Sequence, residues 1–504
     1  MAVRLGTEGW RGVIGDDFTL PNARAFARGV ARWLWERDQA GRGVVVGYDT
    51  RFLSDRVAVE VAGILTRAGI PVRLCSHPVP TPVLSFAVRD LGAAAGLMVT
   101  ASHNPPEYNG IKVKGPHGGP LFGPELATLE AALARRRPLP ASPRLRPEPY
   151  DPDPAYLTHL GGLVPLPLLA RAGFGIVIDP MHGAARNYLR RLLRPYGLRV
   201  RQIRSSADPR FGGVSPEPVA ANLAPLKRAV RSCGAAVGLA TDGDGDRLGV
   251  IDAGGRFVSP QLVYALLLDY LARERNLRGG VVKTVSTTGM IDRLADRYGL
   301  TLYQTPVGFK HISRLFMDGK AVIGGEESGG VGLSPHLPER DGLLAGLLLL
   351  EALVVRGQPL SALLEELEQV TGPHHYCRRD VRLPAGQARL ASRALARLAA
   401  TPEALPPSLA GRPVRGVETL DGLKLHFANG GWVLFRSSGT EPVIRLYAEA
   451  PSAGEVNRLL EAGEELLLGR PGARRAGGTY HGTPERRGAP CPSSSGSSSW
   501  SSSC

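Results

Sequence analysis

Four short polar loops, each following an apolar run, carry the residue types most able to do chemistry in this chain. The first loop reads Thr100-Ala101-Ser102-His103-Asn104-Pro105. A serine at the mouth of a strand can act as a nucleophile once it is activated. Ser, Asn and Pro are also common turn formers, so the loop taken alone favours an ordinary turn. His103 is adjacent in sequence and its side chain need not face Ser102, so a hydrolase triad is not indicated.

The second loop reads DGDGDR and places Asp242, Asp244 and Asp246 at alternate positions. Alternate residues of an extended segment project to one side, so the three carboxylates should converge. Their mutual repulsion favours a bound cation, and hard oxygen ligands indicate Mg²⁺ or Ca²⁺. An EF-hand would need Gly and Glu where the chain has Arg247 and Ala253, which excludes that motif. The spacing favours Mg²⁺ shared with a phosphate, and a solvated acidic turn is the alternative.

The third loop, GEESGG, offers carboxylate and hydroxyl groups after another apolar run. Glu326 could accept hydrogen bonds from vicinal sugar hydroxyls, and Ser328 could donate or accept one. A glycine-rich turn with a solvated acidic edge explains the same residues equally well.

The fourth loop, RSSGTEP, follows the apolar run WVLF. The fork of Arg436, the hydroxyls of Ser438 and Thr440, and the free backbone of Gly439 could form a small anion cradle. The Gly-Lys pair of a nucleotide P-loop is missing, so no ATP site is implied. A hairpin-like turn is the open alternative.

Lysine is rare in this chain, with seven residues in a sequence that otherwise uses arginine. Lys112 and Lys114 follow the serine loop, and Lys310 precedes the glutamate loop. A lysine can lose its proton when its environment shifts its pKa, whereas an arginine cannot. Proton transfer or phosphate binding by Lys112 and Lys310 is therefore plausible, and chance retention is the alternative.

The elements that position these loops read as α/β structure. Apolar runs alternate with helical patterns, which favours domains with buried, largely parallel sheets in which a helix often follows each loop. Residues 21–36, for example, show a helical period that begins at Pro21. Ligands collect at the carboxyl ends of strands in such sheets, where these polar loops lie.

Breaks in composition predict five segments. Proline crowds the stretch before residue 150, one glycine pair lies at Gly254-Gly255, and Gly372-Pro373 follows a helical pattern. The carboxyl-terminal tail is rich in Gly, Arg, Pro and Ser and should be disordered. The predicted segments are 1–150 with the serine loop, 151–255 with the aspartate loop, 256–372 with the glutamate loop, a smaller α+β unit at 373–468 with the fourth loop, and the tail at 469–504.

Charge and composition limit the classes of partner that this chain is expected to bind. The net charge is +15, but no basic run is interleaved with aromatics, so nucleic acid is not expected. The apolar segment 343–355 is too short to span a bilayer and contains Glu351, so no membrane role is expected. Five scattered cysteines and the lack of a signal peptide favour the cytoplasm. A basic chain that binds a dianionic small substrate, as a monomer or homodimer, is the simpler account.

Taken in order, the loops TASHNP, DGDGDR, GEESGG and RSSGTEP, with GTEGWRG and TPVGFK, resemble the α-D-phosphohexomutase superfamily of phosphoglucomutases and phosphomannomutases. Each motif alone is weak, but the ordered set is specific. The resemblance covers about residues 1–468. It implies three related α/β domains with mixed, largely parallel sheets and a smaller α+β C-terminal domain around a central cleft.

The resemblance also implies roles for individual residues. Ser102 would be a phosphoserine that donates to the free sugar hydroxyl, giving a hexose 1,6-bisphosphate that turns around before a phosphate returns. Glucose 1,6-bisphosphate would then act as an activator. The remaining roles are Mg²⁺ binding by Asp242, Asp244 and Asp246 with the serine phosphate; catalysis by Lys112, Arg247 and Arg11; sugar binding by Glu326, Ser328 and Lys310; and phosphate binding by Arg436, Ser438, Gly439 and Thr440.

The preferred sugar remains open at this point. Some family members carry His where this chain has Gly330, so any contact from that His would be absent. VGFK and GEESGG look more like glucose and mannose mutases than the phosphoglucosamine branch. Three alternatives are phosphoglucosamine mutase, a phosphatase with Asp242 as nucleophile, and a non-catalytic protein that binds sugar phosphates.

Overall fold

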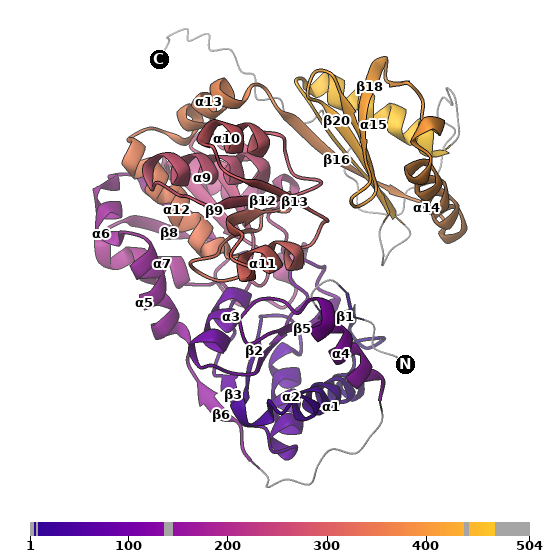
Figure 1. The fold of residues 1–504 in the computed structure, drawn as a ribbon. Coiled ribbons are helices and arrows are strands. Elements are labelled where there is room, and N and C mark those ends of the chain that lie inside the picture. Colours follow the sequence, from indigo (N-terminus) through magenta and orange to yellow (C-terminus); the bar gives the residue numbers. More distant parts are fainter. Residues whose placement is uncertain (1–4, 7–8, 136–144, 438–442, 469–504) are drawn as a thin grey trace. The chain divides into compact units, whose positions relative to one another are not determined.

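The computed structural model describes residues 5–6, 9–135, 145–437 and 443–468 (Figure 1). The chain forms two compact units, and each is treated by itself. The first contains the described residues up to Thr284 together with Ala295–Glu366, and the second contains Val285–Leu294 and the described residues from Leu367 onward. The predicted tail at 469–504 and the positions Ser438, Gly439 and Thr440 lie outside the described residues.

The amino-terminal sheet of the first unit has six strands between two helical layers (Figure 1). Helices α1, α2 and α4 cover one face, and α3 packs on β2 and β4 from the other side. In spatial order the strands are β1 (Gly9–Val13), β5 (Tyr108–Lys114), β4 (Ala95–Val99), β2 (Val44–Tyr48), β3 (Val72–Cys75) and β6 (Glu148–Tyr150). The helices are α1 (Leu20–Glu36), α2 (Ser54–Arg67), α3 (Thr81–Asp90) and α4 (Gly123–Ala134).

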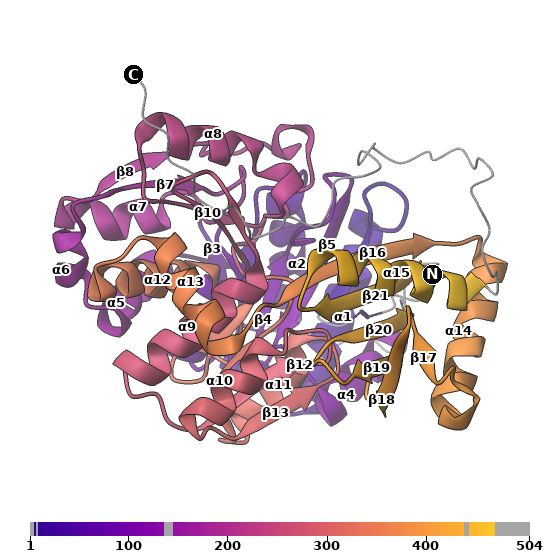
Figure 2. The same cartoon turned by 90° about the horizontal axis from the view of Figure 1, so that it is seen from above.

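The second sheet has α8 on one face and α12 on the other (Figure 2). Ala240 of β9 packs toward α8, while its neighbour Leu239 packs toward Gly346 of α12, as the alternation of a strand requires. The strands are β11 (Phe257–Val258), β10 (Leu248–Asp252), β9 (Val237–Thr241), β7 (Gly175–Asp179) and β8 (Arg199–Gln202). The helices are α5 (Asp153–Leu163), α6 (Leu166–Leu169), α7 (Tyr188–Leu193), α8 (Ala224–Cys233) and α12 (Gly342–Arg356).

The third sheet is smaller and packs against α11 and α9. Ile312 and Phe316 of α11 lie against β14, and the Tyr264 hydroxyl of α9 donates to the Val282 carbonyl at 2.7 Å. The strands are β13 (Leu302–Thr305), β12 (Gly280–Thr284), β14 (Ala321–Gly325) and β15 (Val331–Leu333). The helices are α9 (Pro260–Glu274) and α11 (Phe309–Met317), while α10 (Met290–Tyr298) and α13 (Leu360–Thr371) each contain residues of both units.

The second unit is built on a six-stranded antiparallel sheet that packs against α14 and α15. The Lys424 ammonium donates to the Val285 carbonyl at 2.7 Å, and the Gly289 amide donates to the Glu449 carboxylate at 2.8 Å. These bonds attach the segment after β12 to this unit. The strands are β16 (His375–Arg382), β21 (Val443–Ala450), β20 (Trp432–Ser437), β19 (Leu423–Phe427), β18 (Arg412–Glu418) and β17 (Ser408–Leu409), and the helices are α14 (Ala385–Ala400) and α15 (Ala453–Leu468).

The polar loops connect antiparallel strands, which corrects one expectation. The serine loop joins β4 to β5, the aspartate loop joins β9 to β10, and the glutamate loop joins β14 to β15, and each of these pairs is antiparallel. A strand, and not the expected helix, therefore follows each of these loops. The sheets are mixed, as predicted, because parallel strands adjoin each antiparallel pair.

The helix predicted from the sequence at residues 21–36 is confirmed. Helix α1 begins at Leu20 with Pro21 in its first turn and the Thr19 hydroxyl as its N-cap. The apolar segment forms α12, which is buried along most of its length. Among the described residues no single helix is long and apolar enough to cross a membrane; α12 and α13 pass that test only as a pair, bent by 88°.

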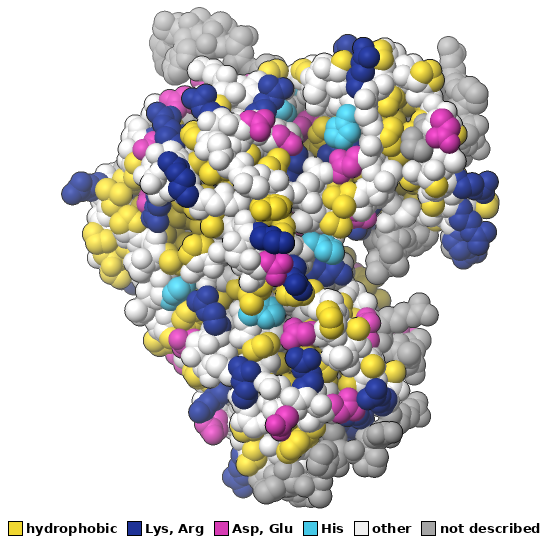
Figure 3. Space-filling view, in the orientation of Figure 1, with side chains coloured by type: hydrophobic (Ala, Val, Ile, Leu, Met, Phe, Trp, Pro, Cys, Tyr) yellow, Lys and Arg dark blue, Asp and Glu magenta, His cyan; other side chains and the backbone are white. Residues whose placement is uncertain are grey.

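Positive and negative side chains are mixed over the face shown in Figure 3. On the face in Figure 3, Lys and Arg side chains stand singly among hydrophobic and acidic side chains and do not gather into one band. The net charge of +15 therefore forms no continuous basic surface on this face.

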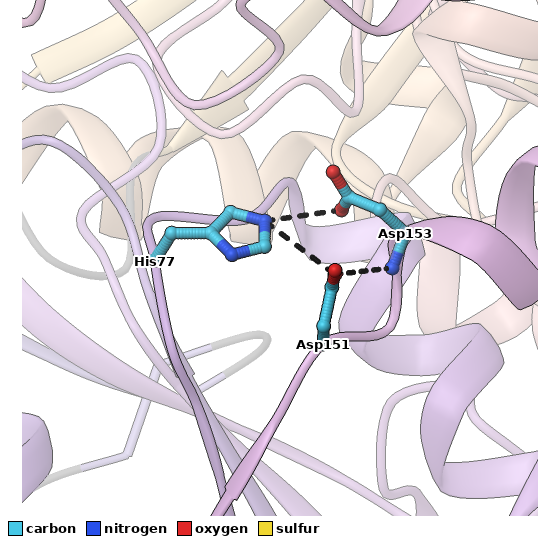
Figure 4. A group of neighbouring side chains, drawn as sticks. All are labelled: His77, Asp151 and Asp153. Carbon is cyan, nitrogen blue, oxygen red and sulfur yellow. Dashed lines mark hydrogen bonds and ion pairs between the residues drawn. The ribbon is translucent and has the colours of Figure 1, made fainter.

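An ion-pair network joins the loop after β3 to the start of α5 (Figure 4). His77 Nε2 lies 3.2 Å from Asp153 Oδ1 and 4.0 Å from Asp151 Oδ1. Asp153 also accepts hydrogen bonds from the Tyr188 hydroxyl and from Arg191. The hydrogen bond to Asp153 raises the pKa of His77. Burial raises the pKa of Asp153, but the bonds from His77, Tyr188 and Arg191 outweigh it and lower that pKa overall.

Replacing His77 by Gln should destabilise the protein in a pH-dependent way. Because the folded-state pKa of His77 is raised above its ordinary value of 6.5, its stabilising effect is full below that pH and is lost as the pH rises through the folded pKa. We expect the fall in the thermal unfolding midpoint to be larger near about pH 5.5 than near about pH 9, where the imidazole is neutral. A difference that stays constant with pH would contradict this role.

Candidate active site

Ser102 is held in a strained and nearly inaccessible position between two loops. Its side chain is buried, and its backbone has φ of 56°, in the left-handed region that non-glycine residues rarely adopt. The Ser102 amide donates to the Thr100 hydroxyl at 2.9 Å, and Ser102 Oγ donates to Asp242 Oδ2 at 2.9 Å. His103 Nδ1 lies 3.4 Å from Ser102 Oγ, so the His103 side chain turns toward the serine. Strained residues held by their surroundings are typical of functional sites.

Arg51 is the scaffold of the serine loop. Its side chain is completely buried, with Nε 3.3 Å from the buried carboxylate of Asp49 and its guanidinium stacked on the Phe211 ring at 4.9 Å. Asp49 also accepts the Thr100 hydroxyl at 2.6 Å. The Arg51 guanidinium donates to four carbonyls at 2.6–3.0 Å, those of Ser102, Asn104, Pro105 and Tyr108. One planar group thus fixes the backbone of the serine and of the residues that follow it.

The three carboxylates of the aspartate loop converge, as their spacing predicts. Asp242, Asp244 and Asp246 are 0% exposed, and one oxygen of each lies within 4.8 Å of the others. Asp244 accepts from the Thr81 hydroxyl and from Lys112 at 2.7 Å, and Asp246 accepts from Lys112 at 3.0 Å. Oδ1 of Asp244 and Oδ1 of Asp246 have no hydrogen-bond partner among the described residues. Buried, unpaired carboxylate oxygens are suitable ligands for a hard divalent cation.

The pKa values of Asp242 and Asp246 are shifted in opposite directions. Burial, followed by the charges of Asp246 and Asp244, raises the pKa of Asp242 well above its usual range. Burial also acts on Asp246, but Arg340, Lys112 and Arg247 outweigh it and lower its pKa. A cation would remove the repulsion that raises the pKa of Asp242.

Two of the basic residues predicted for catalysis contact this cluster, and the third contacts the serine loop. Lys112 is buried on β5, and its ammonium bridges Asp244 and Asp246. Arg247 is buried, its amide donates to Asp242 Oδ1 at 3.1 Å and its guanidinium lies 3.3 Å from Glu217. Arg11 on β1 donates to Asn104 of the serine loop at 2.8 Å.

This collection of cations lowers the pKa of His103. Burial is the largest cause, and the charges of Arg247, Arg11, Lys112 and Arg340 add to it. His103 is therefore neutral near pH 7, and the site as a whole is suited to a multiply charged anion.

The glutamate loop is tied to its own surroundings. Both Glu326 oxygens are hydrogen-bonded: Oε1 accepts the Gly308 amide at 3.0 Å and Oε2 accepts Arg340 at 2.9 Å. Ser328 is half-buried in this loop, and Lys310 is half-buried at the second position of α11. Through Arg340, which also donates to Asp246 at 2.8 Å, the glutamate loop is connected to the aspartate loop.

Arg436 lies in the second unit near the end of β20, where its Nε donates to Asp421 at 2.7 Å. The predicted cradle residues Ser438, Gly439 and Thr440 fall outside the described residues. Their phosphate-binding role stays a prediction.

Sequence reasoning missed Asp49, Arg51, Thr81 and Arg340. Asp49 and Arg51 could have been found from the sequence. They follow the apolar run VVVG, just as the residues of the four polar loops follow apolar runs. Thr81 and Arg340 could not have been found in this way, because each reaches the aspartate loop from a distant part of the chain.

Comparisons with known proteins agree along the chain. Family models of phosphoglucomutase/phosphomannomutase match domain I at residues 2–138, domain II at 154–255, domain III at 259–370 and the C-terminal domain at 382–465. A phosphoglucomutase/phosphomannomutase of Thermococcus kodakarensis is 32% identical over 93% of this chain and 99% of the relative. A phosphoglucosamine mutase of Moorella thermoacetica is 33% identical over 93% of this chain and 100% of the relative.

Solved structures agree as well. A Thermus thermophilus protein provisionally named a phosphomannomutase is 40% identical, with a TM-score of 0.81 over 93% of this chain and 99% of that one.

Replacing Arg51 by Lys should separate loop geometry from charge. Lysine keeps the cation beside Asp49 but has no planar fork for the four carbonyls. We expect the free energy of unfolding to fall by about 2–4 kcal/mol and turnover to fall about 10- to 100-fold as Ser102 shifts. Chemical denaturation and steady-state kinetics measure both, with Arg24→Lys at a surface pair with Glu60 as the matched control. Unchanged turnover in Arg51→Lys would refute a positioning role.

Proposed function

The chain belongs to the phosphoglucomutase/phosphomannomutase family, and from this premise we propose that it interconverts hexose 1-phosphates and hexose 6-phosphates through a phosphoserine at Ser102. The observation that carries the proposal is the buried contact between Ser102 Oγ and the cluster of three carboxylates with Lys112. Enzymes of this family are isomerases that transfer a phosphoryl group within one sugar. The proposed substrates are glucose and mannose phosphates.

In the proposed cycle, Ser102 carries the phosphoryl group and a hexose monophosphate binds with its free hydroxyl toward it. The bond between Ser102 Oγ and phosphorus breaks as the sugar oxygen bonds to phosphorus, which gives the hexose 1,6-bisphosphate. The sugar then exchanges its ends, and its other phosphoryl group returns to Ser102. Glucose 1,6-bisphosphate is the proposed activator because it can phosphorylate an empty Ser102.

Lys112 is the proposed proton-transfer group. The sugar hydroxyl loses its proton when it attacks phosphorus, and a proton is returned to the other sugar oxygen when its phosphoryl group leaves for Ser102. Lys112 is buried beside Asp244 and Asp246, within the same cluster that Ser102 contacts through Asp242. Arg247 and Arg11 are proposed to stabilise the negative charge on the transferring group.

Mg²⁺ is the proposed metal, held by Asp242, Asp244 and Asp246 together with the phosphate on Ser102. The buried Oδ1 atoms of Asp244 and Asp246, which lack partners among the described residues, fit such an ion. Bound Mg²⁺ would neutralise charge on the phosphoryl group during transfer.

Sugar and distal phosphate binding complete the proposal. Glu326 and Ser328 would bind sugar hydroxyls, and Lys310 would bind the substrate from the start of α11. Arg436, Ser438, Gly439 and Thr440 would bind the phosphate that is not reacting. The enzyme is proposed to act in the cytoplasm as a monomer or homodimer, without nucleic acid or membrane.

Two other activities are alternatives to the proposed one. A phosphoglucosamine mutase would use the same site, and relatives with that name match this chain over nearly its whole length. A phosphatase would use Asp242 as nucleophile, but both Asp242 oxygens accept hydrogen bonds, from Ser102 and from the Arg247 amide. That arrangement favours an orienting and metal-binding role for Asp242.

Replacing Ser102 by Ala should abolish the mutase reaction. With Mg²⁺ and a trace of glucose 1,6-bisphosphate, the unsubstituted protein should convert glucose or mannose 1-phosphate to the 6-phosphate, as followed by ³¹P NMR. Ser102→Ala should show no conversion, because the phosphoryl carrier is missing. Glucosamine 1-phosphate in a separate tube tests the alternative sugar by relative rate.

Two outcomes would reject this function. Inorganic phosphate released by both proteins would support a phosphatase, and its acyl phosphate would be labile to hydroxylamine, unlike phosphoserine. Sugar phosphate binding without turnover by the folded, phosphorylated protein would support a non-catalytic role.

Removing the metal should reversibly inactivate the enzyme. After treatment with a chelator we expect loss of turnover and a lower thermal unfolding midpoint, because the carboxylates repel one another. Added Mg²⁺ should restore both, and Asp244→Asn should require at least about tenfold more Mg²⁺ because it removes a charged ligand. Full activity of the metal-free protein would exclude a catalytic metal.

A further inference from the structure

Gly330 ends the glutamate loop at a point where no side chain fits. A β-carbon added there would lie 2.0 Å from Cδ and 2.8 Å from Cγ of Arg340. The backbone of Gly330 is not in the left-handed region, unlike that of Gly329, which has φ of 94°. Space, and not backbone conformation, therefore requires glycine at residue 330.

Arg340 fills that space and cannot move aside cheaply. It is buried, and its guanidinium donates to Asp246 Oδ2 at 2.8 Å and to Glu326 Oε2 at 2.9 Å. The guanidinium also lies over the Phe309 ring at 5.5 Å. Only a planar fork with several donors can bridge two carboxylates from different loops in this way.

The backbone of Arg340 is fixed by its neighbours. Glu339 is buried and pairs with Lys114 of β5, two residues beyond Lys112, while its Oε1 accepts the Arg340 amide at 3.0 Å. Asp341 is the N-cap of α12, accepting the Leu343 amide at 2.8 Å. The N-terminus of α12 and the buried ion pair between Glu339 and Lys114 therefore fix the position of the Arg340 backbone.

We propose that Arg340 is a positioning residue that ties the sugar-binding carboxylate of Glu326 to the metal-binding carboxylate of Asp246, and that Gly330 is required because any side chain there expels it. The inference rests on the proposed function for the meaning of these two carboxylates. The Gly308 amide and Arg340 each donate to one Glu326 oxygen, so the Glu326 carboxylate is held in one orientation. In that orientation the carboxylate can accept hydrogen bonds from vicinal hydroxyl groups of a hexose phosphate.

This arrangement predicts a specific kinetic signature. Loss of Arg340 frees Glu326 to rotate, which weakens sugar binding in the ground state and the transition state alike. KM should therefore rise more than kcat falls. Since Arg340 and a cation both attract the Asp246 carboxylate, Mg²⁺ affinity should not fall when the arginine is removed.

A double-mutant cycle tests the proposal. Arg340→Ala and Gly330→Ala should each raise KM for glucose 1-phosphate about 10- to 100-fold, the size expected for loss of a charge-assisted hydrogen bond. The double variant should be no worse than Arg340→Ala alone, because alanine at 340 removes the atoms that collide. Arg340→Lys should recover only part of the loss, since one ammonium cannot bridge both carboxylates.

Thermal unfolding midpoints provide a readout that needs no turnover. Gly330→Ala should lower the midpoint of the unsubstituted protein but not that of Arg340→Ala. Gly162→Ala in α5, where a β-carbon meets nothing within 4 Å, and Arg314→Ala at an exposed pair with Asp318 are matched controls that should leave KM unchanged.

The inference would be overturned if the changes in unfolding midpoint of Gly330→Ala and Arg340→Ala were additive in the double variant. An unchanged KM in Gly330→Ala would overturn it as well. If the unsubstituted protein did not convert hexose phosphates at all, the proposed function would fail instead. The midpoint cycle would still decide whether Gly330 and Arg340 are sterically coupled.

Discussion

Burial of negative charge is the constraint on which the first unit depends. Asp242, Asp244 and Asp246 are 0% exposed and lie close together, and such a cluster is tolerable only when cations compensate it. Lys112 and Arg340 supply two of them from the β5 strand and the start of α12. The surrounding architecture can be understood as the means of holding these cations in place without exposing the cluster to water.

The way in which the strands are connected brings residues that are far apart in the sequence close together. In each of the three sheets of the first unit, parallel strands adjoin an antiparallel pair, and the loop that connects this pair carries predicted site residues. Ser102 and Asp242 are 140 residues apart yet lie within hydrogen-bond distance, and Arg340 spans 94 residues to Asp246. Short hairpin connections have little freedom to rearrange, which suits groups that must stay aligned during phosphoryl transfer.

The sequence was informative where function is concentrated in contiguous loops. Alternation within DGDGDR correctly predicted that three carboxylates converge, and the helical period from Pro21 correctly predicted α1. It failed on the elements that follow the loops, because periodicity in a short apolar run does not distinguish a parallel strand from one arm of a hairpin. Arg51 and Arg340 were missed because one arginine among many is hard to single out by type; only the fold shows that each organises a loop.

The choice between lysine and arginine follows the same charge logic. Four of the seven lysines, Lys112, Lys114, Lys283 and Lys424, are buried, so a chain that prefers arginine keeps lysine largely for the interior. Lys114 pairs with Glu339, and Lys424 donates to the Val285 carbonyl. The rarity of lysine in this chain therefore indicates burial and not catalysis. What sets Lys112 apart is its place between two carboxylates of the cluster that Ser102 contacts. A compact ammonium at that place fits the proposed proton transfer, whereas Arg340, always charged and planar, is suited to bridging carboxylates and holding them still.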